Sequence, residues 1–193
     1  MADSPPNSLP TMTSPLLRHQ RGFTLLELMI TLSVLAILVA VAAPAFNQTM
    51  ASSRAAGLSN ALVGSLNLAR SEAIKRGQTV TVCKTANPNA ANTNCAAGAA
   101  WRDGWLVFVD NGTRGTVDGN DVRIKVVQPS GIGETNVSAG GNVANYLSFL
   151  PRGESRGSDG AVPSASLNIC TGGIQRRVLV NAVGRTHIAK GDC

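Results

Sequence analysis

The most prominent feature of the hydrophobic pattern is a long apolar segment near the N-terminus. From Phe23 to Ala43 the residues are nearly all apolar, and Glu27 is the one charged side chain. As an α-helix rising about 1.5 Å per residue, such a segment is roughly 30 Å long, which matches the hydrocarbon core of a bilayer. The pattern therefore predicts a transmembrane helix over residues 23–46.

The flanking residues indicate how this helix is oriented. Arg18 and Arg21 precede it, and no basic cluster follows it directly. Because basic residues favour the cytoplasmic side, we expect the leader, residues 1–22, in the cytoplasm and the C-terminal part outside. Secretory signal peptides have a shorter apolar region of about 7–15 residues, so this segment does not fit that class.

Residues 1–15 are rich in Pro and Ser and predict no regular structure. Met12 is an alternative start of the chain.

After Pro44 the chain turns polar but keeps a helical rhythm. Apolar residues recur every three or four positions and form one stripe, at Leu58, Leu62, Leu66, Ala69 and Ala73. Gly77 follows two basic residues and is a typical helix stop. We therefore predict an amphipathic helix over residues 47–77 that packs this stripe against the rest of the chain.

Beyond Gly77 the hydrophobic period changes to two residues, and Gly, Asn, Asp and Pro separate the segments. The expected strands are Thr79–Cys83, Trp105–Val109, Val122–Val127, Tyr146–Leu150, Ser166–Cys170, Arg177–Asn181 and Thr186–Ala189. The stretch Pro129–Asn145 is glycine-rich, and we expect it to be irregular and mobile. The predicted fold is α+β, with a long N-terminal helix packed on an antiparallel β-sheet formed by residues 78–193.

Length and charge limit the classes of protein that fit. Residues 47–193 number 147 and suffice for one globular head with its own core. The formal net charge is +6, and removal of residues 1–22 takes away two Arg and one Asp, which leaves +5. This excess suits anionic partners such as nucleic acid or phospholipid head groups, and it equally suits a plain solvated surface.

Four cysteines follow the predicted transmembrane helix, where an oxidising compartment favours disulfides. None forms a C-x-x-C pair and the chain has two histidines, so we expect no metal site. Three pairings are formally open, and the most local one joins Cys83 to Cys95 and Cys170 to Cys193. In the chain-entropy model, each such loop stabilises the fold by about 3 kcal/mol.

The sequence contains no recognisable catalytic motif. It has no G-x-S-x-G, no phosphate-binding glycine pattern and no histidine in a nucleophile motif. The Asp-rich segment Asp110–Asp121 lacks the spacing of an EF-hand, so turn formation is the favoured interpretation and a calcium loop the alternative. Trp101 and Trp105 are expected to fill the core, with a stacking surface for a sugar or a base as the alternative. We expect neither an enzyme nor a cofactor.

Residues Gly22-Phe23-Thr24-Leu25-Leu26-Glu27 resemble the processing motif of type IV prepilins. The resemblance implies that a prepilin peptidase cleaves between Gly22 and Phe23 and methylates Phe23 at the new N-terminus. It also implies that Glu27 pairs with the terminal amine of a neighbouring subunit during assembly. Such a partner accounts for a carboxylate within the membrane segment, which otherwise costs about 2.5–3.5 kcal/mol.

Further blocks of sequence resemble the GspH/FimT family of minor pilins and pseudopilins. They are Leu68–Gly77 (LARSEAIKRG), Trp101–Asp110 (WRDGWLVFVD) and Val178–Arg185, with a cysteine at the end of the chain. The resemblance implies a single-pass subunit of the bacterial inner membrane with a periplasmic head, which later joins a pilus or pseudopilus. The implied partners are other pilins through the N-terminal helix, the prepilin peptidase and an inner-membrane assembly platform.

The C-terminal part concentrates five basic or titratable residues, Arg176, Arg177, Arg185, His187 and Lys190. In the FimT branch, a C-terminal G-R-x-R motif is associated with DNA binding, and this chain has Gly-Arg-Thr-His at residues 184–187. The histidine that replaces the last arginine is mostly neutral at pH 7 when unperturbed. These residues are therefore a candidate DNA surface, with a solvated basic edge as the alternative.

Together these features predict a minor pilin that assembles into or primes a type IV pilus, with DNA as a candidate ligand. One alternative is an H-type pseudopilin near the tip of a type II secretion pseudopilus. An alternative from another class is a membrane-anchored periplasmic hydrolase.

Overall fold

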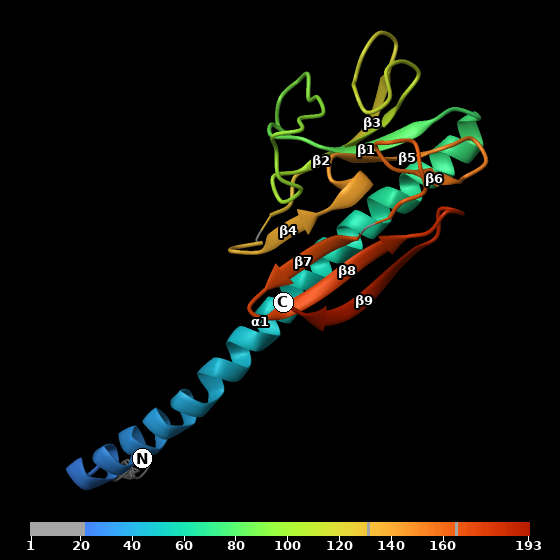
Figure 1. Ribbon diagram of the computed structural model, residues 1–193. Helices are drawn as coiled ribbons and strands as arrows, with labels where there is room; N and C mark the ends of the chain where they lie inside the picture. Colours follow the sequence, from blue (N-terminus) through green and yellow to red (C-terminus); the bar gives the residue numbers. More distant parts are fainter. Residues whose placement is uncertain (1–21, 131, 165) are drawn as a thin grey trace, which may run out of the picture. The chain divides into compact units, whose positions relative to one another are not determined.

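The computed structural model describes residues 22–130, 132–164 and 166–193 (Figure 1). The predictions for residues 1–21 of the leader lie outside the described residues. The chain divides into two compact units, one ending at Ala42 and one comprising Ala43–Cys193. The N-terminal unit contributes the first part of a helix, and the second unit holds the β-sheets and the hydrophobic core.

Helix α1 covers Leu25–Arg76, so the two predicted helical segments belong to one element of 52 residues. Thr24 caps its start, because the backbone N–H of Glu27 donates a hydrogen bond to Thr24 Oγ1 at 3.2 Å. At the other end, Gly77 has a φ of +64°, the left-handed conformation that commonly ends a helix. The predicted helix stop at this glycine is confirmed.

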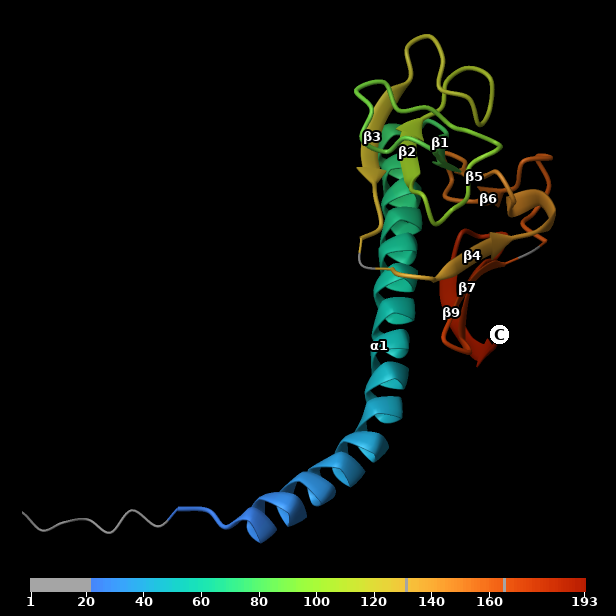
Figure 2. The same ribbon diagram turned by 90° about the vertical axis from the view of Figure 1, so that its left-hand side faces the viewer.

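The strands form two antiparallel sheets rather than one. The first has the order β3-β2-β1-β5-β6, and the second has the order β4-β7-β8-β9. The members of the first sheet are β1 Val80–Lys84, β2 Trp105–Val109, β3 Val122–Val127, β5 Tyr146–Phe149 and β6 Ser155–Arg156. Those of the second are β4 Asn136–Ala139, β7 Leu167–Thr171, β8 Ile174–Val180 and β9 Thr186–Asp192. Figure 2 shows β4, β7 and β9 on one side of α1 within the second unit.

The prediction that Pro129–Asn145 is irregular was wrong. This stretch contains β4 and a short 3₁₀ helix, Gly141–Val143. Val137 and Val143 anchor the two elements in the core, because both side chains are buried. Four strand residues between polar and glycine-rich neighbours give too short an alternation to be recognised in the sequence.

Strand β8 begins three residues earlier than predicted, and β9 extends to Asp192. The cause is the two-residue turn Gly172-Gly173, where both residues have positive φ. Such a turn fixes a tight hairpin register, and Thr171 accordingly pairs with Ile174. The Gly-Gly pair between two apolar runs was the sequence signal that would have located this hairpin.

The apolar stripe of α1 packs on both sheets in one core cluster. Trp105 is 1% exposed, and its indole N–H donates a hydrogen bond to Ser65 Oγ of the helix at 2.8 Å. Trp101 is 3% exposed and donates to the carbonyl of Ala144 at 3.0 Å. Both tryptophans are therefore core residues, and the alternative of an exposed stacking surface is wrong.

The structure contains two disulfides, Cys83–Cys95 and Cys170–Cys193. The first ties the loop after β1 to the sheet. The second ties the C-terminal residue to the end of β7, so that β9 is held at both ends.

Candidate functional site

The N-terminal unit presents a largely apolar exposed surface. Every residue from Gly22 to Met50 is exposed, and the exposed fraction of Phe23 is 79%. Within the part of the chain that the structure describes, α1 is the one helix long and apolar enough to cross a membrane. Side chains of this kind require a bilayer or the helices of other subunits as their surroundings.

The sequence-predicted processing residues lie at the start of this helix. Gly22, Phe23 and Thr24 are outside regular structure, so the bond between Gly22 and Phe23 precedes the helix. Glu27 is in the first helical turn, three residues after the cap Thr24. A carboxylate in this place also interacts favourably with the positive end of the helix dipole.

Side chains of the Asp-rich loop serve turn geometry. Asp121 accepts hydrogen bonds from the backbone N–H of Asn111 and Asp118, and Asp118 accepts one from the N–H of Thr113. No group of three or more metal-ligating side chains occurs among the described residues. The arrangement agrees with the favoured interpretation as a turn.

Asp110 begins this loop and is buried in the sheet. Its Oδ2 accepts hydrogen bonds from Thr81 Oγ1 at 2.6 Å and from the backbone N–H of Gly115 at 2.8 Å. Burial raises the pKa of the Asp110 carboxyl, and these hydrogen bonds oppose the rise in pKa only in part. The loop is therefore anchored by a carboxylate whose charge is unfavourable in its surroundings.

The five residues of the C-terminal cluster do not form one surface. In β8, Val178 and Val180 are buried against the helix, so Arg176 lies on the same face as these valines and Arg177 on the opposite face. The register pairs Arg176 with Lys190 and Leu179 with His187, which places Lys190 on the helix-facing side and His187 on the outer side. Arg185 lies in the turn before β9. The predicted surface is thus divided into an outer group and a helix-facing pair.

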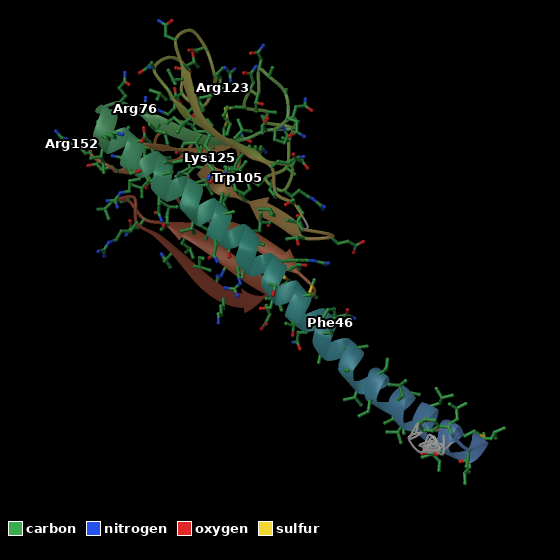
Figure 3. The ribbon with its side chains drawn as sticks, turned by 180° about the vertical axis from the view of Figure 1, so that it is seen from behind. Phe46, Arg76, Trp105, Arg123, Lys125 and Arg152 are labelled. Carbon is green, nitrogen blue, oxygen red and sulfur yellow. A yellow bond between two sulfur atoms is a disulfide. The ribbon has the colours of Figure 1, made fainter. Side chains whose placement is uncertain are left out.

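Near that turn, Arg70 of α1 brings other segments together. Its Nε donates a hydrogen bond to the carbonyl of Gly153 at 3.1 Å. A Cβ on Gly184 would lie 2.1 Å from the same carbonyl and 2.9 Å from the Nε of Arg70, so only glycine fits there. Arg152 directly precedes Gly153 in the sequence, and Arg185 directly follows Gly184. Both arginines are exposed (Figure 3 labels Arg152). The backbone next to Arg152 and Arg185 therefore lies close to Arg70, and we name Arg70, Arg152 and Arg185 the arginine cluster.

Arg70 and Arg152 were not predicted as site residues from the sequence. They lie far from the C-terminal segment along the chain, and the contacts through Gly153 and Gly184 connect them only in the fold. The Gly-Arg pair at residues 184–185 was the one local signal.

The long capped helix, the two antiparallel sheets behind it and the exposed apolar start define a pilin-like protein. The family model of the type II transport protein GspH matches residues 58–184, and the prokaryotic N-terminal methylation motif matches residues 17–43. Because the first match covers more than half of the chain, the protein belongs to the GspH family. The predicted GspH/FimT-type relationship and the predicted fold class are thereby confirmed. Members of this family are structural pilins and pseudopilins, which assemble with other pilins and are processed by a prepilin peptidase.

Two solved structures are similar to this chain, and the first of them supports the fold. The type IV minor pilin FimU of Pseudomonas aeruginosa aligns with a TM-score of 0.53 at 13% identity, covering 72% of this chain and 90% of that chain. The minor pseudopilin EpsH of the type 2 secretion system of Vibrio cholerae aligns with a TM-score of 0.46 at 17% identity, covering 71% and 97%. No curated protein matches the chain.

Proposed function

We propose that this protein is a minor pilin that is cleaved between Gly22 and Phe23, methylated at Phe23 and incorporated into a type IV pilus. The observation that carries the proposal is the exposed apolar first part of α1, which lies within the match to the methylation motif, residues 17–43. In the membrane this surface contacts lipid, and in a filament it contacts the equivalent helices of other subunits. The subunit acts through assembly and carries out no catalysis.

Glu27 supplies the specific contact of this assembly. One carboxylate in an otherwise apolar helix is costly in lipid, and a positively charged terminal amine on a neighbouring subunit offsets that cost. The prepilin peptidase and an inner-membrane assembly platform act before the subunit enters the filament. The head, residues 47–193, then lies on the periplasmic side.

DNA is the ligand that we assign to the head. The arginine cluster offers three guanidinium groups, and no ion pair involves them among the described residues. Arg177 extends positive charge along the outer face of β8, and His187 of β9 lies on the same face. Exposed arginines without carboxylate partners suit the phosphate backbone of nucleic acid, which is bound largely without regard to sequence.

The DNA assignment is tested by fluorescence anisotropy with the full-length protein in detergent and duplex DNA at about 50 mM and 200 mM salt. The slope of log affinity against log salt should be reduced by about one for each lost phosphate contact in Arg152→Gln and Arg185→Gln. Arg123→Gln is the matched control, because its guanidinium already bonds to the loop at Thr93 and Asn94. Absence of binding at the lower salt would refute the DNA assignment and leave the pilin assignment intact.

An H-type pseudopilin of a type II secretion system is the second candidate. The description of the matched family, a type II transport protein, favours it. The two candidates differ in the phenotype of a deletion strain: loss of twitching and transformation supports the pilus, and loss of exoprotein secretion supports the pseudopilus. A Glu27→Ala gene should fail to complement in either case, whereas a membrane-anchored hydrolase would keep its activity.

A further inference from the structure

Arg176 and Lys190 face each other across β8 and β9 on the helix-facing side of the second sheet. Cross-strand partners have Cβ atoms about 4.5–5.5 Å apart, and like charges in this relation are destabilising. Asp192 is on the same face two residues further along β9, but it forms no ion pair with either cation among the described residues. Among the described residues, no ion pair offsets the repulsion between the two cations.

The two cations border a small cavity of about 180 Å³ between the sheet and α1. Its walls are formed by Ser52 of the helix and by residues 174–176 and 190–192 of the two strands. The Nε of Arg176 is shielded from solvent and has no hydrogen-bond partner among the described residues. A buried donor without a partner is rare in folded proteins and commonly indicates a missing water or ion. An anion with several acceptor oxygens would satisfy this donor and relieve the repulsion with Lys190.

The position along α1 indicates the source of such an anion. Phe46 is the last large apolar residue of the N-terminal run and is 66% exposed (labelled in Figure 3). Ser52 follows it by six residues, which is about 9 Å of helix. The head-group region of a bilayer is roughly 5–8 Å thick on each side of the hydrocarbon core. Measured along the helix, Ser52 at the wall of the cavity therefore lies at about the outer boundary of the head-group region when Phe46 is at the edge of the hydrocarbon.

We propose that Ser52, Arg176 and Lys190 form a binding pocket for a phosphate group, and that the head group of an anionic phospholipid occupies it while the subunit is in the membrane. The proposal rests on the proposed membrane topology but not on DNA binding or on the type of filament. Entry into a filament removes the subunit from the lipid and empties the pocket.

The test uses the full-length protein in non-ionic detergent and counts bound lipid by native mass spectrometry. Phosphatidylglycerol should bind in a saturable way and more tightly than phosphatidylcholine with the same acyl chains. Arg176→Gln and Lys190→Gln should each weaken phosphatidylglycerol binding about tenfold, the effect of losing one charge-assisted hydrogen bond. Lys190 is exposed, so its variant keeps the test valid if Arg176→Gln does not fold.

Arg177→Gln is the matched control on the opposite face, and it should bind phosphatidylglycerol as the wild type does. Equal binding of phosphatidylglycerol by the wild type and by Lys190→Gln would overturn the proposal. If inorganic phosphate protects the wild type against thermal unfolding and phosphatidylglycerol shows no preference over phosphatidylcholine, the pocket takes free phosphate and the lipid source is wrong. A third outcome would also refute the pocket: Lys190→Gln weakens duplex DNA binding as much as Arg177→Gln does and leaves lipid binding unchanged. Both residues would then belong to one nucleic-acid surface.

Discussion

Substitution of Ser65 by alanine tests how the helix is held on the first sheet. The hydroxyl of Ser65 accepts the indole N–H of Trp105 at 2.8 Å and donates to the carbonyl of Ala61 at 2.9 Å. Ser65 is fully buried and Trp105 nearly so, hence no water can replace the lost acceptor without opening the core. The variant leaves one buried N–H without a partner, which costs about 1–3 kcal/mol.

This loss corresponds to a measurable fall in the unfolding temperature. The unit Ala43–Cys193 has 193 − 42 = 151 residues. Domains of this size lose about 2–4 °C per kcal/mol, so the unfolding midpoint should fall by roughly 2–12 °C. The assay is thermal unfolding of the full-length protein in detergent, followed by circular dichroism and by the fluorescence of the two buried tryptophans.

Ser71→Ala is the matched control in the same helix. Its hydroxyl also donates to a backbone carbonyl, that of Leu68, but the residue is exposed. We expect a change within about 0.5 kcal/mol for this variant. A Trp105→Phe background completes a double-mutant cycle, in which Ser65→Ala should lose most of its effect because the indole donor is gone. If Ser65→Ala is no more destabilising than Ser71→Ala, the hydrogen bond between helix and sheet does not contribute as described.

Three further predictions concern the head. The pKa of Asp110 in the folded protein lies above its usual value near 3.8. Between these two pKa values the folded protein binds more protons than the unfolded chain. The contribution of Asp110 to stability therefore falls as the pH rises through this range. Asp110→Asn keeps an oxygen acceptor for Thr81 and Gly115 and should lose this pH dependence. Denaturant unfolding from pH 4 to 7 measures the free energy of unfolding, and an unchanged slope of that energy against pH would refute the prediction. Gly184→Ala should destabilise the head by well over 1 kcal/mol, because at a φ of +77° its Cβ would overlap the Gly153 carbonyl. The control Gly77→Ala has a φ of +64° and open space around it, so it should cost only conformational strain of about 1 kcal/mol. Equal losses of stability in chemical denaturation would argue against the close approach at Gly184. Joint replacement of Cys83 and Cys95 by alanine should lower the free energy of unfolding by about 3 kcal/mol, measured in urea with the other disulfide intact, and a loss below about 1 kcal/mol would contradict the loop-closure estimate.

Local patterns predicted most of the fold. The change from a period of three or four residues to a period of two located the end of α1 at Gly77, and the bounds of β2 and β3 were predicted without error. The separation of the strands into two sheets was not predictable, since strand order depends on contacts between distant segments. Strand β4 was missed because one buried valine among four residues gives no clear alternation.

The candidate sites divided in the same way. Gly22, Phe23 and Glu27 form one continuous motif, so their arrangement needed only the sequence. The basic residues from 176 to 190 were predicted as one cluster, but the alternation of β8 and the register with β9 distribute them over both faces. Arg70, Arg152 and Ser52 entered the candidate sites only through tertiary contacts, which residue spacing does not encode.

The central claim is that Phe23 is the first residue of the mature subunit. Intact-protein and peptide mass spectrometry of the protein isolated from its native membrane tests this claim most directly. We expect one N-terminus, at Phe23, carrying a methyl group on its amine. A mature protein that begins at any other residue, or an unprocessed leader in assembled filaments, would contradict it.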